Sequence, residues 1–237
     1  MNLTTAIYRN SVYFFALIPL FALWGFWVTY VTRPPETLAV VDHVHGIAML
    51  GWCLMLIAQA GLIRFQRRDI HRQLGKVSYA LAPLIVLSTL SLAHYRLNVR
   101  GLTAEGLYLL SIQILLLVQF AVGYSLAIKN RKRSDIHARY MVFTALPLLD
   151  PIFARILSVN FMPAVEFSAG TIQYLTFGFT DLILIGLLVW DWKSQGRRDV
   201  FLPMLILILA TQIPLFFSVD STIWQGFASW YIGLPLS

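Results

Sequence analysis

The chain has 237 residues, of which 58% are hydrophobic and only 12% charged, with a net charge of +7. Soluble domains carry about 25% charged residues, so this composition excludes an ordinary soluble fold and indicates an integral membrane protein. The basic residues form short clusters beside apolar runs, and nucleic-acid binding needs a continuous basic face instead. We therefore expect these basic residues to interact with the lipid bilayer and not with nucleic acid.

Seven apolar runs have about the 20 residues that a helix needs to cross a bilayer. They cover residues 12–31, 44–63, 77–95, 107–128, 140–158, 171–190 and 201–219. The first run is too long for the apolar part of a signal peptide, and no small-x-small cleavage site follows it. The sequence thus predicts an all-α bundle of seven transmembrane helices, in one domain over residues 1–237. Pro147, Pro151 and Pro214 are expected to kink their helices.

The basic residues also predict an orientation. Most of the 18 Lys and Arg residues follow the second, fourth and sixth runs. Acidic residues lie on the other side of the predicted membrane, at Glu36, Asp42, Glu105 and Glu166. Because Lys and Arg are retained on the cytoplasmic side, we expect a cytoplasmic N-terminus and an extracytoplasmic C-terminus.

The second run opens with VVDHVHGIAMLGW, which places Asp42, His43 and His45 at its outer edge. Helical spacing predicts one face made of His45, Met49, Trp52, Leu56 and Gln59. Ionisable residues inside a membrane are costly and usually functional, although a packed face with one hydrogen-bonded histidine is the alternative. His43 should point away from His45, because residues i and i+2 do not share a helical face.

His94 ends the third run at the same predicted depth as His45. Consecutive antiparallel helices usually pack side by side with axes about 8–10 Å apart. We therefore predict that His45 and His94 share a ligand or cofactor, with Met49 as a soft neighbour that suits copper or haem iron. Asp42 would orient an imidazole, and His43 would be a further, more expendable metal ligand.

Two histidines at the cytoplasmic edge come with a sequence repeat. RRDIH opens the third run and RSDIH opens the fifth, so His71 and His137 should stand at the same depth on parallel helices. Asp69 and Asp135 suit helix N-caps, so the repeat partly describes two helix starts. Two such imidazoles are also able to hold one metal or haem iron, or to bind lipid or quinone head groups.

Three charged residues fall within the fifth and sixth runs. Asp150, Arg155 and Asp181 should face the protein interior, because each is costly against lipid. One interpretation is a structural ion pair between Arg155 and either aspartate. The other is a polar cavity that opens outward, lined by these residues together with Asp42 and Glu105.

The segments GFWVTY, HVHGIAMLGW, HRQLG and HARYM together resemble a family of uncharacterised bacterial multi-pass membrane proteins with GFWxxY, HxHG, HRxLG and HxRxM motifs. The resemblance implies the bacterial inner (cytoplasmic) membrane and no particular activity. The chain is more weakly similar to transmembrane cytochromes b that hold two haems with histidines from four helices. Residues 107–128 contain no histidine, so one haem fits better than two.

These observations favour a histidine-based site for haem b or a transition metal (Cu, Fe or Zn), used in redox chemistry or metal handling. They name no catalytic residue and leave open whether the protein is an enzyme. One alternative is a small-solute or ion carrier that uses Asp150, Arg155 and Asp181. Another is a non-catalytic assembly or sensor subunit, whose histidines serve a membrane-protein partner or a second copy of the chain.

Overall fold

The computed structural model describes residues 2–161 and 169–236, so Glu166 lies outside the described part. The fold is all-α, as predicted. Its α-helices are α1 Leu3–Phe26, α2 Val40–Arg64, α3 Arg68–Gly75, α4 Ser78–Arg100, α5 Ala104–Lys129, α6 Ser134–Phe143, α7 Leu149–Ile156, α8 Ala169–Gln195, α9 Phe201–Gln212 and α10 Thr222–Ile232. Shorter 3-10 and π segments connect or extend them.

Within the described residues, six helical segments are long and apolar enough to cross a membrane. They are Leu3–Val31, Val40–Arg64, Arg68–Arg100, Ala104–Lys129, Ser134–Phe161 and Gly170–Gln195. The seventh predicted run forms a shorter apolar helix, Phe201–Leu215. Large apolar side chains such as Leu20, Leu87 and Leu182 remain exposed on the outside of the bundle, as expected where lipid is the solvent. The chain is therefore a multi-pass helical membrane protein.

The first helix starts earlier than residue 12, the predicted start of its run. It begins at Leu3, because the side chain of Asn2 accepts a hydrogen bond from the backbone N–H of Thr5 and caps it. Asn is among the best N-cap residues. The hydropathy pattern alone did not include this polar first part of the helix.

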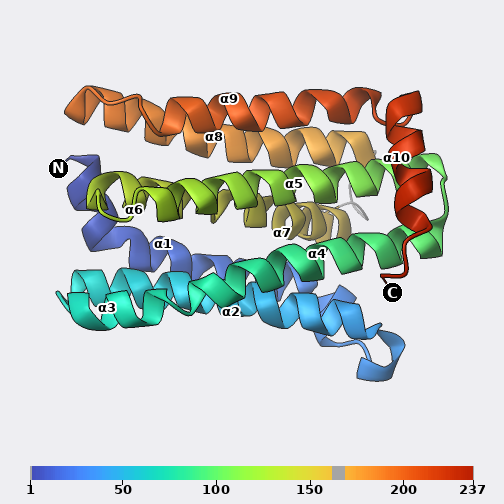
Figure 1. Cartoon of the computed structure of the whole chain (residues 1–237), viewed down its shortest axis with the longest axis horizontal. Helices are drawn as coiled ribbons and strands as arrows, with labels where there is room; N and C mark the ends of the chain where they lie inside the picture. Colours follow the sequence, from blue (N-terminus) through green and yellow to red (C-terminus); the bar gives the residue numbers. More distant parts are fainter. Residues whose placement is uncertain (1, 162–168, 237) are drawn as a thin grey trace.

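The long helices lie along one axis, and the two chain ends lie at opposite ends of the bundle (Figure 1). Consecutive long helices pack against each other from α1 to α6, while α7 packs on α1 and α8 and α9 packs on α5 and α8. The short helix α10 crosses the ends of α4 and α5 at the end opposite to the N-terminus. The Trp224 indole N–H holds it there by donating to the carbonyl of Leu107 at 3.1 Å.

The fifth predicted span is not one continuous α-helix. α6 ends at Phe143, a 3-10 turn covers Leu146–Leu148, α7 follows, and a π-helical turn, Leu157–Phe161, ends the segment. Pro147 lies inside the 3-10 turn and Pro151 lies in the first turn of α7, where a missing N–H costs little. The predicted kink is therefore a 3-10 interruption in the middle of the span, which we call the break between α6 and α7.

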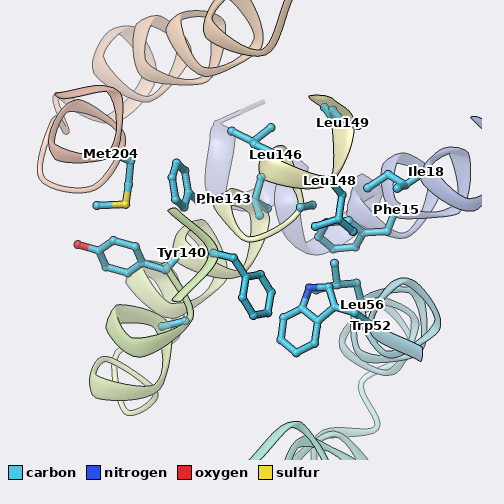
Figure 2. Packing of buried hydrophobic residues seen from close by; sticks show 14 of the residues in the cluster. Phe15, Ile18, Trp52, Leu56, Tyr140, Phe143, Leu146, Leu148, Leu149 and Met204 are labelled. Carbon is cyan, nitrogen blue, oxygen red and sulfur yellow. The ribbon is translucent and has the colours of Figure 1, made fainter. Parts of the chain in front are cut away.

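The main hydrophobic core surrounds this break (Figure 2). Figure 2 labels residues of this core from α1, α2, α6, the 3-10 turn, α7 and α9, namely Phe15, Ile18, Trp52, Leu56, Tyr140, Phe143, Leu146, Leu148, Leu149 and Met204. Phe143 fits because α5 has a glycine opposite it: a Cβ on Gly123 would come within 2.6 Å of its ring. The broken segment is therefore fixed by packing on both sides.

Candidate functional site

The first turns of α2 join α4 through two polar contacts. Asp42 accepts a hydrogen bond from the backbone N–H of Ala39 at 3.0 Å, which caps the helix start, and its other oxygen binds the guanidinium of Arg96 on α4. One turn along α2, Nδ1 of His45 lies 3.3 Å from the hydroxyl of Ser88, also on α4. Asp42 therefore pairs with an arginine instead of orienting the imidazole of His45.

His43 points to a different neighbour, as predicted. Its Nδ1 lies 2.8 Å from the hydroxyl of Tyr30, and its Nε2 lies 3.3 Å from the carbonyl of Pro35. A Cβ on Gly46 would come within 3.3 Å of the same Tyr30 hydroxyl. The GFWxxY and HxHG segments therefore interlock, with His43 anchoring the loop that joins α1 to α2.

His94 is buried on the side of α4 that faces α10. Its ring meets the ring of Tyr231 edge-on at 5.4 Å, and the Tyr231 hydroxyl donates to the carbonyl of Leu90 at 2.6 Å. Burial raises the pKa of Tyr231 to about 12, so this hydroxyl keeps its proton and remains a donor.

The structure therefore does not bring His45 and His94 together. At 3.6 residues per turn, His94 lies on the side of α4 opposite to Ser88 and Arg96, which both meet α2. The expected antiparallel packing of the two helices is present. The prediction of a shared ligand needed the rotation of α4 about its axis as well, and apolar spacing does not specify that rotation.

Asp150 forms the buried centre of the polar residues on α7 and α8. It sits in the first turn of α7, directly after the helix break, where the helix dipole favours negative charge. Its Oδ1 accepts hydrogen bonds from Nε2 of Gln173 at 2.8 Å and from the hydroxyl of Thr176 at 2.6 Å. Both α8 donors are neutral and were not predicted, although Gln173, Thr176 and Thr180 follow one helical face and could have been found by their spacing.

The side chain of Arg155 extends from α7 toward α1 and forms no ion pair among the described residues. Its guanidinium stacks over the Phe26 ring at 4.3 Å and donates to the carbonyl of Pro151 at 3.1 Å. The close approach that allows this contact requires Gly25, since a Cβ there would come within 2.8 Å of the Ile152 carbonyl. The predicted ion pair with Asp150 or Asp181 is therefore not formed.

We call Asp42, His45, Arg96, Asp150 and Arg155 the outer polar cluster, after the side of the membrane that the sequence predicts for it. Arg155 is near enough to Asp42, Arg96, Asp150 and His45 for their charges to interact. The cluster contains residues of α2, α4 and α7. Asp42 is paired with Arg96, and Asp150 accepts from Gln173 and Thr176, so Arg155 is the charged residue of the cluster without a direct ion pair among the described residues.

Two of the residues predicted to line the cavity lie elsewhere. Glu105 is exposed at the end of the bundle, where it accepts from Nε of Arg100 at 3.0 Å. Asp181 is half-buried further along α8 and accepts from Nε2 of Gln212 on α9 at 3.1 Å. Asp181 lies on α8 five residues beyond Thr176, so it is separate from the outer polar cluster.

The two inner histidines occupy equivalent positions, as the repeat predicted. His71 and His137 are each the fourth residue of a short helix, α3 and α6. Nδ1 of His71 donates to the carbonyl of Gln59 at 3.4 Å, and Nδ1 of His137 donates to that of Ala127 at 2.9 Å. The two rings are near enough for their charges to interact. Each histidine ties its helix to the end of the preceding span.

The predicted face of α2 is mostly a packing face. Trp52 is fully buried and meets the rings of Phe120 and Tyr124 edge-on at 5.0 and 5.6 Å (Figure 2 shows Trp52). Met49 packs against the same core. Nε1 of Trp52 and Oε1 of Gln59 are buried without a hydrogen-bond partner in the described part of the chain.

A buried charge network that the sequence did not reveal lies at the opposite end of the bundle. Arg139, from the HARYM segment, is fully buried and forms two hydrogen bonds with Asp191, at 2.7 and 2.6 Å. It also donates to the hydroxyl of Thr4 at 3.0 Å and to Oε1 of Gln195 at 2.6 Å. Arg139 therefore fastens α6 to α1 and α8.

The predicted metal-binding histidines differ in how well their surroundings suit a metal ion. Among the described residues, no group of three or more His, Cys, Asp or Glu side chains is placed to hold an ion. His45 has the charge of Arg155 beside it, which opposes a bound cation. His71 and His137 fit better, because a histidine that donates through Nδ1 to a carbonyl presents Nε2 to a ligand.

Comparison with family models, with curated proteins and with solved structures gives no match to the chain. The family resemblance of the four motifs therefore stays a prediction. Each motif nevertheless has a structural role, in contacts between helices or between a helix and a loop. What the sequence and the fold establish together is a multi-pass helical membrane protein.

Proposed function

We propose that the protein binds a small anionic solute in the outer polar cluster and carries it across the membrane. The observation that carries this proposal is Arg155, a guanidinium inside a candidate span that has no carboxylate partner among the described residues. Asp42 and Asp150 attract this guanidinium only from a distance, and a charge at this depth without a direct partner is costly. A ligand that brings its own negative charge would recover that cost, and a carboxylate would match the planar donors of an arginine.

The neighbours of Arg155 support an anionic ligand. Asp150 accepts from two neutral donors and Asp42 from Arg96, so neither carboxylate forms a direct ion pair with Arg155. A cation would meet both arginines of the cluster. For this reason the cluster favours the carrier interpretation over a metal site at His45.

The backbone also supports a carrier. Irregular backbone at membrane depth is tolerated where it is buried in protein or lines a cavity, and broken helices are typical of transporter binding sites. Asp150 follows the break between α6 and α7, and Arg155 precedes the π turn Leu157–Phe161. The π turn Trp27–Val31 follows Phe26 on the other side of Arg155. Such π turns occur frequently at functional sites.

For the membrane arrangement we propose seven crossings of the inner membrane, with the N-terminus cytoplasmic. The positions of the two chain ends at opposite ends of the bundle support an odd number of crossings (Figure 1). A reporter fused after residue 237 should then behave as extracytoplasmic. A cytoplasmic signal from that fusion would contradict the arrangement.

Ligand binding is testable with the purified protein and a panel of small anions, namely acetate, succinate, citrate, phosphate and sulfate. We expect one class of anion to raise the thermal unfolding temperature of the wild type and to leave Arg155→Met unaffected. Arg100→Met is the matched control, because Arg100 lies in the rim ion pair with Glu105, and it should respond like the wild type. Uptake of the active anion into proteoliposomes then separates a carrier from a binding subunit.

Two outcomes would contradict the proposal. One is the absence of stabilisation by any of these anions. The other is an equal response of the Arg155→Met variant, which would place the ligand elsewhere. Binding without uptake would favour the assembly or sensor subunit, with the same site.

The inner histidines support a second candidate, a site for a transition metal or haem iron. This candidate is supported by the equivalent hydrogen bonds of His71 and His137, whose Nδ1 atoms both donate to backbone carbonyls. An absorption spectrum and metal analysis of the purified protein test it. Bound metal or haem should be lost in both His71→Ala and His137→Ala and retained in His43→Ala, and a preparation with neither group would count against it.

A further inference from the structure

A hollow between α1 and α2, at the bundle end that holds the N-terminus, has the chemistry of a phosphate site. Its volume is about 420 Å³, and it is lined by Thr5, Tyr8, Arg9, Arg64 and Gln66. These residues offer two guanidinium groups, two hydroxyls and an amide, with no carboxylate among them. Arginine is the residue most often used for bidentate recognition of phosphate.

The lining is held in place before any ligand arrives. The Arg64 guanidinium donates to the backbone carbonyl of Arg9 and lies over the ring of Tyr13, 4.9 Å from its centroid. Arg9 is on the turn of α1 that follows Thr5 and Tyr8, so its side chain reaches the same space. One arginine is therefore fixed by the fold, and the other is free to close on a ligand.

Gln66 gives a second, independent observation. It follows the end of α2 with φ of +59°, the one non-glycine residue with positive φ in the described chain. The N–H of Arg67 reaches the carbonyl of Leu62 and that of Gln66 reaches Ile63, the pattern that ends helices and normally has glycine at this position. A glutamine here adopts a disfavoured backbone conformation, and it lines the hollow.

The position of the hollow identifies the source of the phosphate. Arg64 is the last residue of the candidate span Val40–Arg64, so the hollow lies at the level of lipid head groups. Two large apolar side chains beside it, Tyr13 and Phe65, are exposed by 60% and 74%. They would contact the apolar part of a lipid whose phosphate sits between Arg9 and Arg64. We propose that this hollow binds the phosphate of an anionic phospholipid head group.

Native mass spectrometry of the detergent-purified full chain tests this, with phosphatidylglycerol as the anionic probe and phosphatidylcholine as the zwitterionic one. We expect the wild type to retain phosphatidylglycerol preferentially. Arg9→Gln should weaken that retention about tenfold, as expected for loss of a charge-assisted hydrogen bond. Lys132→Gln, an exposed change in the loop between α5 and α6 and outside the hollow, should have no effect.

Gln66→Gly separates the site from folding. It should raise the unfolding temperature, because glycine suits a positive φ, and still weaken lipid retention. Equal retention by wild type and Arg9→Gln would overturn the proposal, as would equal retention of the two lipids. Inorganic phosphate that displaces the lipid and stabilises the wild type alone would show that the site takes free phosphate, and would overturn the lipid as its source.

Discussion

The fifth span carries one arginine at each end of its break, and the two arginines have opposite surroundings. Arg139 on α6 is fully buried and forms a two-bond pair with Asp191, supplemented by Thr4 and Gln195. Arg155 on α7 has an aromatic ring and one carbonyl instead. A buried charge with a complete set of partners serves the fold. The arginine without such a set is the better candidate for binding a ligand.

The two aspartates differ in the same way. Asp191 accepts from an arginine, whereas Asp150 accepts from the neutral side chains of Gln173 and Thr176. Neutral donors hold an aspartate in place without cancelling its charge. Within the outer polar cluster, Asp150 and Arg155 therefore keep separate charges, whereas Arg139 and Asp191 are joined in an ion pair.

The largest effect is expected from Asp191→Ala, which leaves the buried Arg139 charge unpaired. Removing one partner of a buried ion pair costs about 3–5 kcal/mol. The unfolding temperature of the purified protein should fall sharply. Replacing both residues, as Arg139→Met with Asp191→Leu, should recover much of the loss, and a single variant as stable as the wild type would show that this pair does not fasten the bundle.

Much of the fold followed from the sequence, because apolar runs of a given length have few alternatives in a bilayer. Helices do begin beside Asp69 and Asp135, but their N-cap residues are Arg67 and Arg133, so the prediction that these aspartates are N-caps is wrong. The interior placement of Asp150 and the opposite directions of His43 and His45 are local consequences of helical spacing. Helical spacing could not predict Asp191 as the partner of Arg139, because 52 residues separate them in the chain. The contact of His94 with Tyr231 could not be predicted either, because it depends on the rotation of α4 about its axis and on the packing of α10 against α4.

A smaller effect is expected at Asp150. Asp150→Ala removes the acceptor of two buried hydrogen bonds, and each contributes about 1 kcal/mol. Gln173 and Thr176 keep their contacts with each other, at 3.2 and 3.1 Å, which limits the loss. Asp150→Asn keeps a carbonyl oxygen for both donors and should be milder. Chemical denaturation of the two variants compares them, and equal losses would indicate that the charge of Asp150, and not its hydrogen bonds, stabilises α7.

The smallest effect concerns the exposed pair at the inner end. Hydrogen bonding to Arg197 holds the pKa of Asp199 below its usual value of 3.8. A lowered pKa in the folded state adds stability above the usual pKa, and this stability is lost as the pH falls through the lowered value. Exposed pairs contribute less than about 1 kcal/mol. Arg197 also binds Asp135, so Arg197→Gln loses both contacts and should be slightly less stable than the wild type at pH 6. The difference should shrink as the pH falls below 3.8, and a difference unchanged with pH would contradict this.

The central claim is that Arg139 serves the fold and Arg155 serves a ligand. The most direct measurement compares the unfolding temperatures of Arg139→Met and Arg155→Met in ligand-free protein. Arg139→Met leaves Asp191 buried and unpaired, at a cost of about 3–5 kcal/mol. Arg155→Met gives up a cation–π contact of about 1 kcal/mol and one hydrogen bond to a carbonyl, but no ion pair, so it should unfold near the wild-type temperature. A loss for Arg155→Met as large as that for Arg139→Met would contradict the account.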